Sequence, residues 1–152
     1  MFERLFTRTV EQCVRAGLVD GSKLHVEASY VQANASIDAV VKGPPELIAA
    51  YKKACHAVES KLSEACTPAA YELVNDRIAG TTDPDSSMVS RAGLPSRARY
   101  YHHRAVDDAH GGITAVETTT GSIAENRKLI GVIAQHEENT SCQTATVVGD
   151  RK

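Results

Sequence analysis

The beginning of the chain carries apolar residues at helical spacing. Between residues 2 and 16 they recur three and four positions apart, which is the pattern of an amphipathic helix. This stripe consists of Phe2, Leu5, Phe6, Thr9, Val10, Cys13 and Val14. Gly17 is a typical helix stop, and Arg15 suits the negative end of a helix. The pattern therefore predicts a leading helix in residues 1–17.

Hydropathy alternates with period two between residues 23 and 31. One face carries Leu24, Val26, Ala28 and Tyr30, and the other carries His25, Glu27 and Ser29. The alternation predicts a β-strand that directs the Glu27 carboxylate away from its apolar side. Polar residues 32–43 lead from this strand to Pro44-Pro45.

Residues 44–80 have the pattern of two helices. Pro45 is typical of a first helical turn, and an apolar face follows it as far as Leu62. Thr67-Pro68 opens a second, shorter apolar stripe, which Gly80 ends. We therefore predict a helical insertion over residues 44–80. The next residues, up to 98, place glycine and proline among Thr, Asp and Ser, which indicates a loop.

The last part of the chain predicts a hairpin, a helix and a strand. Residues 99–108 and 113–119 alternate with period two around Gly111-Gly112, as in a β-hairpin. Ser122 and Glu125 form an S-x-x-E capping box, which predicts that a helix begins there. Its expected inward residues are Ile123, Leu129, Ile130, Ile133 and Ala134. Residues 145–148 are typical of a short buried strand, and the whole order of elements predicts an α/β fold with a mixed sheet and flanking helices.

Length and composition limit the class of protein. With 152 residues, the chain is one domain or part of one. Hydrophobic residues make up 42% and charged residues 24%, which excludes a disordered chain. No apolar run approaches the ~20 residues that span a bilayer, and the start has no signal segment. Four cysteines without a C-x-x-C pair fit reduced thiols, so we predict a cytoplasmic protein with no membrane partner.

One segment of the chain is clearly basic. The net charge is −2, so the electrostatic field of the whole molecule does not attract a nucleic acid. Any nucleic acid must therefore bind to a local basic patch. Residues 91–104 contain four arginines, two histidines and no acid. The candidate phosphate-binding residues are Arg97, Arg99, His102, His103 and Arg104, with Tyr100 and Tyr101 available for stacking. The alternative is a solvated hairpin edge, whose charges discourage further sheet pairing.

Two carboxylates stand out by position. Glu27 lies in the middle of a predicted strand, and Asp150 directly follows the last one. If these strands are neighbours, the two acids can converge on one divalent cation, which relieves their mutual repulsion. Oxygen ligands favour Mg²⁺ or Mn²⁺, and such a site supports phosphoryl transfer. Asp20 competes for the first position, although Val19-Asp20-Gly21-Ser22 is typical of a turn.

A second cluster of possible metal ligands surrounds the hairpin. Its members are His102, His103, Asp107, Asp108 and His110, which suggest zinc and a metal-dependent hydrolase. Adjacent strand residues point to opposite faces, however, so His102 and His103 cannot bind the same ion. The phosphate-loop, dinucleotide-binding and nucleophile-elbow motifs are absent from the sequence.

Several blocks of the sequence resemble the catalytic domain of bacterial insertion-sequence transposases of the DDE class. The first block is Gly17-Leu18-Val19 with His25-Val26-Glu27-Ala28-Ser29 and Gln32-Ala33-Asn34-Ala35-Ser36. The middle blocks are Thr82-Asp83-Pro84-Asp85, His102-His103-Arg104-Ala105-Val106-Asp107 and Thr114-Ala115-Val116-Glu117-Thr118-Thr119, and the last is Thr146-Val147-Val148-Gly149-Asp150. The resemblance covers essentially the whole chain in order, and the blocks are specific together rather than singly.

The resemblance implies an RNase-H-like fold and a triad of acids that holds two Mg²⁺ for cleaving and joining DNA at transposon ends. Asp150 matches the second acid of the triad, and Glu27 stands where the family has its first Asp. The extra methylene of Glu27 moves the carboxylate by ~1.5 Å, and a misplacement of about 1 Å can cost on the order of 10²-fold in rate. The third acid, a glutamate expected well after Asp150, has no counterpart in these residues.

We therefore predict that residues 1–152 are a partial transposase catalytic domain, incomplete at the C-terminus and catalytically inactive. One alternative is a non-catalytic DNA-binding or regulatory remnant that uses Arg97, Arg99 and Arg104 without chemistry. Another is a decayed fragment without function. A strand left with one uncovered edge would also expose apolar surface, from which we expect a homodimer or aggregation.

Overall fold

The chain folds into a mixed α/β architecture of three helices and seven strands within the described residues. A computed structural model describes residues 2–35, 40–62, 78–90 and 95–149, with the backbone alone for 58–62. The helices are α1 (Phe2–Arg15), α2 (Pro45–Leu62) and α3 (Glu125–Thr140). The strands are β1 (Lys23–Gln32), β2 (Val40–Lys42), β3 (Ile78–Gly80), β4 (Ser87–Val89), β5 (Arg97–Asp107), β6 (Ile113–Thr120) and β7 (Thr146–Gly149). The α/β class predicted from the sequence is thus confirmed.

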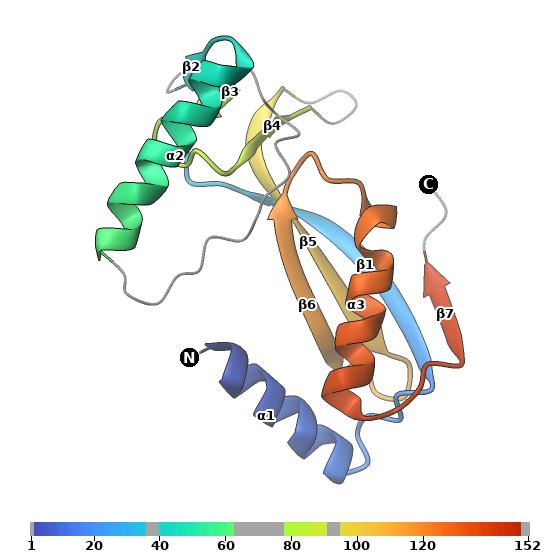
Figure 1. Cartoon of the computed structure of the whole chain (residues 1–152). Helices are drawn as coiled ribbons and strands as arrows, with labels where there is room; N and C mark the ends of the chain where they lie inside the picture. The colour runs from blue at the N-terminus through green and yellow to red at the C-terminus, as the bar shows by residue number, and fades with distance from the viewer. Residues whose placement is uncertain (1, 36–39, 63–77, 91–94, 150–152) are drawn as a thin grey trace. The chain divides into compact units, whose positions relative to one another are not determined.

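Five of the strands form one mixed sheet. Its order is β4-β5-β1-β7, and β6 pairs with β5 as well. β1 and β7 run parallel, with Val26 opposite Gly149 at the end of the printed register. The first and last strands of the predicted element order are therefore direct neighbours (Figure 1).

β1 and β5 run antiparallel. The amide of Ala33 donates to the carbonyl of Ala98 at 2.9 Å, while the amide of Asp108 donates to the carbonyl of Lys23 at 3.1 Å. These bonds join opposite ends of β1 and β5, which fixes their antiparallel direction. β5 and β6 form the predicted hairpin, closed by a bond of 2.8 Å from the Asp107 amide to the Gly112 carbonyl.

The chain divides into two compact units. The first contains the residues up to Ser29, His102–Thr118 and the residues from Ala124 onward. Its core is a cluster of small and branched side chains from β1, β5, β6 and α3, supported by the partly buried Leu129 and Ile133. The cluster consists of Leu24, Val26, Ala105, Ala115 and Val132. Helix α3 thus covers the apolar face that the period-two pattern of β1 predicts (Figure 1).

The second unit contains Tyr30–Tyr101 and Thr119–Ile123. In it, β2 and β3 form an antiparallel pair with Val40 opposite Gly80, and β4 pairs antiparallel with the start of β5. Helix α2 begins at Pro45, as predicted, and buries Ile48 completely.

Three short strands differ from the sequence prediction. β2 lies in the polar stretch 32–43, and β4 lies in the predicted loop 80–98. β3 replaces the end of the second predicted helix of the 44–80 insertion, whose remaining residues 63–77 lie outside the described residues. Strands of three residues offer too few positions for a period to be recognised, and their pairing partners supply the hydrogen bonds.

The predicted capping box of α3 is wrong, and its predicted inward face is right only in part. The N-cap is Ala124 and makes no side-chain capping bond, so Ser122 does not form a capping box with Glu125. The Ser122 hydroxyl instead bonds to Ser87 Oγ at 2.8 Å. Ile130 is 74% exposed and Ala134 is also exposed. The residues buried along α3 are Val132, His136 and Thr140. Of the predicted inward residues, Ile123 is buried, and Leu129 and Ile133 pack partly buried against the core. Hydropathy therefore misplaced Ile130 and Ala134 and missed the two buried polar residues.

The last strand is exposed rather than buried. All four residues of β7 are exposed, including Val147 and Val148. β7 stands at the end of the strand order, where β1 is its one described neighbour. The homodimer expected from such an edge stays a prediction.

None of the helices in the described part of the chain is long and apolar enough to cross a membrane.

Candidate functional site

The first candidate acid lies beside the end of the last strand. Glu27 directly follows Val26 on β1, and Val26 is the register partner of Gly149 on β7. Asp150, the second candidate acid, is the next residue in the chain after Gly149 and lies outside the described residues. The hypothesis of a cation site requires that the strands of the two acids are neighbours, and β1 and β7 fulfil this requirement. Of the two acids, Glu27 is the one that the structure describes.

Glu27 is an exposed carboxylate with one described cationic partner. Its Oε2 lies 3.6 Å from Arg104 Nη2 on β5, and the Glu27 side chain is 59% exposed. An ion pair this exposed contributes about 0–1 kcal/mol, because water screens it and two long side chains must be ordered. Glu27 is thus accessible to a cation from solvent, although Arg104 competes for the same oxygen.

A second charge cluster lies at the beginning of β1. The Asp108 carboxylate is 2.6 Å from His25 Nε2 and 3.1 Å from Lys23 Nζ. The hydrogen bond from His25, followed by that from Lys23, lowers the pKa of Asp108. Lys23 and His25 share a strand face with Glu27 because they alternate along β1. This face therefore carries charges of both signs, arranged in pairs.

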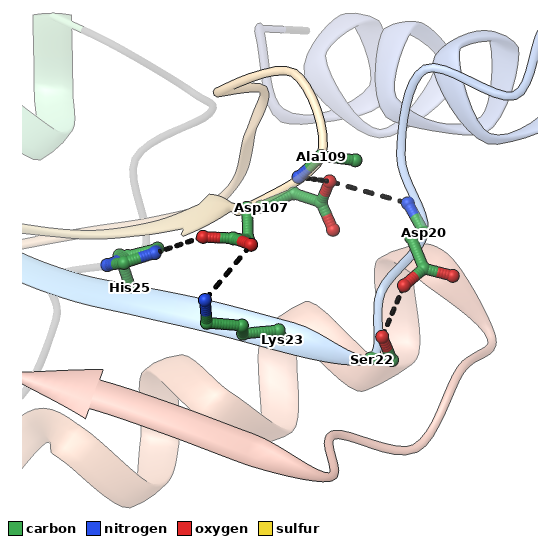
Figure 2. Close-up of polar contacts among 7 residues, drawn as sticks. Asp20, Ser22, Lys23, His25, Asp107 and Ala109 are labelled. Carbon is green, nitrogen blue, oxygen red and sulfur yellow. Dashed lines mark hydrogen bonds and ion pairs between the residues drawn. The ribbon is translucent and has the colours of Figure 1, made fainter.

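Asp107, next to Asp108, is buried and anchors the loop before β1. Its Oδ2 accepts the Gly21 amide at 2.8 Å. Its Oδ1 accepts the amides of Ala109 at 3.1 Å and Asp20 at 3.4 Å (Figure 2). Gly21 has a φ of +79°, a conformation that other residues rarely adopt, and a Cβ there would lie 2.7 Å from Cys142 Cβ. Asp107 is therefore engaged by backbone amides and has a structural role.

Asp20 lies in this loop rather than on a strand. Its side chain is exposed and accepts a hydrogen bond from the Ser22 hydroxyl (Figure 2). Such a local bond to the residue two positions on is typical of an Asp in a turn. Glu27, by contrast, lies on β1 itself, directly after the residue that pairs with Gly149 of β7.

The basic residues of β5 divide between two faces. The His102 Nδ1 atom is 3.0 Å from Thr118 Oγ1, whereas His103 is buried with 1% exposure. Burial lowers the pKa of His103, and the carboxylates of Glu117 and Glu125 oppose this shift in part. His103 therefore cannot reach a phosphate in solvent, and the predicted set of five does not form one surface.

Arg97 and Arg99 lie at the start of β5, in the second unit. The Arg99 guanidinium carbon is 5.6 Å from the ring centroid of Tyr30, within the range of a cation–π contact. The Tyr30 ring in turn stacks on Tyr101, with centroids 4.5 Å apart and planes inclined by 16°. The period-two pattern places Tyr30 on an apolar strand face but does not predict this contact, because the contact depends on the pairing of β1 with β5.

The hairpin histidines and aspartates do not assemble into a metal site. Within the described ranges, no three His, Cys, Asp or Glu side chains are grouped so that they could hold a metal ion. Asp107 binds backbone amides, Asp108 binds His25 and Lys23, and His110 is exposed. These contacts give the zinc-hydrolase alternative no support.

Compared with known proteins, the chain matches no protein-family model, no curated protein and no solved structure.

Proposed function

We propose that the chain is a DNA-binding domain of the DDE transposase type, with an RNase-H-like fold and a carboxylate pair for Mg²⁺ or Mn²⁺. The observation that carries the proposal is the parallel pairing of β1 with β7. Val26 on β1 lies opposite Gly149 on β7, and the next residues in the sequence are Glu27 and Asp150. The antiparallel β1, β5 and β6 followed by α3 and a parallel β7 are compatible with this fold. The sequence blocks that resemble these transposases supply the rest of the argument.

The available oxygen donors suit a weakly bound cation. Glu27 is exposed, and Mg²⁺ commonly keeps several waters while it binds one or two carboxylates and a substrate phosphate. A bound cation would polarise a DNA phosphate and stabilise the leaving oxygen. Glu27 and Asp150 are two of the three acids that the resemblance implies, and Glu27 replaces a shorter residue. We therefore expect this sequence to bind the cation and DNA without efficient strand cleavage.

The experiment is a calorimetric titration of the purified chain with Mn²⁺. The wild-type chain should bind Mn²⁺, and Glu27→Gln and Asp150→Asn should each weaken binding by about tenfold or more, because each removes one anionic ligand. Asp108→Asn is the matched control, since its carboxylate lies on the same sheet but is engaged by His25 and Lys23. Equal Mn²⁺ affinity in the wild type and both acid variants would contradict the proposal.

A non-catalytic DNA-binding role is the second candidate. Arg97 and Arg99 form no ion pair with a carboxylate in the parts of the chain described, whereas Arg104 is paired with Glu27. This alternative is favoured if the chain has no measurable affinity for Mn²⁺ and the Asp150→Ala variant still binds DNA.

A further inference from the structure

The second unit carries an aromatic platform on neighbouring strands. Tyr101 of β5 is buried, with 5% exposure, and Tyr30 of β1 stacks on it while remaining 37% exposed. The buried ring holds the outer one in a fixed orientation, so little conformational freedom remains to be lost when a flat ligand binds. We call Tyr30, Tyr101 and the adjacent Arg99 the Tyr30 platform.

The platform is positively charged. Arg99 holds its guanidinium over the Tyr30 ring, and Arg97 lies two residues earlier on β5 and therefore on the same strand face. None of the ion pairs among the residues that the structure describes includes either arginine. Two acids of the same unit have other partners, since Asp83 accepts from Tyr100 at 2.5 Å and Asp85 pairs with His56 at 2.6 Å.

We propose that the Tyr30 platform binds a single-stranded segment of nucleic acid, with Arg97 and Arg99 near the phosphates and one base stacked on the Arg99 guanidinium, which the Tyr30 ring supports from its other side. Aromatic rings and guanidinium planes are the surfaces on which unpaired bases stack, and the guanidinium charge attracts the backbone. Duplex bases are already stacked on one another, so they cannot use the platform without unstacking. This inference rests on the proposed function in that both require nucleic acid, but it uses neither Glu27 nor a metal ion.

The alternative explanation of the same contacts is sheet stability. Stacked aromatic side chains on neighbouring strands stabilise a sheet whether or not a ligand binds. The two explanations differ in which property Tyr30→Leu changes. Sheet stability predicts a lower unfolding temperature alone, whereas nucleic-acid binding also predicts weaker binding by a chain that is still folded. Tyr30→Phe keeps the stacked ring and is the control for both. They also differ for Arg99→Gln, which leaves both rings in place and removes the charge.

The test is fluorescence anisotropy with a labelled thymidine oligonucleotide of about 15 nucleotides and a hairpin duplex of the same charge, at about 50 mM salt without divalent cations. The wild type should bind the single strand at least about fivefold more tightly than the duplex. Tyr30→Leu and Arg99→Gln should each lose about fivefold or more in affinity, and Tyr30→Phe should stay within about twofold. Arg8→Gln, on the exposed side of α1, is the control for loss of one positive charge.

Thermal unfolding of each variant separates loss of binding from loss of folding. A folded Tyr30→Leu or Arg99→Gln chain that binds the single strand as tightly as the wild type would overturn the inference, as would equal wild-type affinity for the duplex. If Tyr30→Leu does not fold, Arg99→Gln still decides the question. Because the Mn²⁺ titration uses Glu27 and Asp150 and no oligonucleotide, either proposal can fail while the other survives.

Discussion

At the residue scale, two adjacent aspartates have opposite environments and should respond differently to the same substitution. Asp107 is buried and accepts three backbone amides, whereas Asp108 is exposed and forms ion pairs. Asp107→Ala leaves these amides without their acceptor, so we expect a loss of about 3 kcal/mol or more in the free energy of unfolding. Asp108→Ala removes screened surface pairs and should destabilise the fold far less than Asp107→Ala.

Urea unfolding of the two variants followed by circular dichroism measures this difference. The sequence presents Asp107-Asp108 as equivalent polar residues at a strand end, and only the hairpin geometry decides which of them turns inward. Equal destabilisation by the two substitutions would show that the amide contacts of Asp107 contribute nothing specific.

At the scale of elements, periodicity predicted which long segments form helices and which form strands, but it did not predict all of their buried residues. The helix at 2–16, the strand at 23–31 and the hairpin around Gly111-Gly112 were predicted within a few residues because each repeats its pattern several times. The sequence leaves open whether the segments of β1 and β7 are neighbours in the sheet, since strand pairing depends on tertiary contacts. The Tyr30 platform and the burial of His103 were not predicted, because both depend on which strands become neighbours.

Two substitutions on α3 compare the stability contributions of a buried polar residue and an exposed apolar one. The fully buried His136 has Nδ1 2.6 Å from Thr114 Oγ1 and Nε2 3.1 Å from the Gly21 carbonyl oxygen, so its imidazole is satisfied inside the protein. His136→Ala creates a cavity and removes the partner of buried polar groups, which should cost about 2–4 kcal/mol. Ile130→Gln on the exposed side should change stability by less than about 0.5 kcal/mol.

The two α3 variants are compared by their urea midpoints at constant m-value. Hydropathy alone predicts the reverse order, with the apolar Ile130 buried and the polar His136 exposed. A larger loss for Ile130→Gln than for His136→Ala would therefore contradict the packing of α3 described above.

At the scale of the whole molecule, the net charge of −2 gives no long-range attraction for DNA, so any binding must come from a few local contacts. Each neutralised phosphate of a single strand contributes about −0.7 to the slope of log affinity against log salt concentration. With Arg97 and Arg99 as the phosphate contacts, the slope should be about −1.4, and Arg99→Gln should reduce it to about −0.7. Anisotropy titrations across a salt series measure both slopes. A much steeper wild-type slope would mean that additional cations take part, and an unchanged slope in Arg99→Gln would mean that Arg99 does not touch a phosphate.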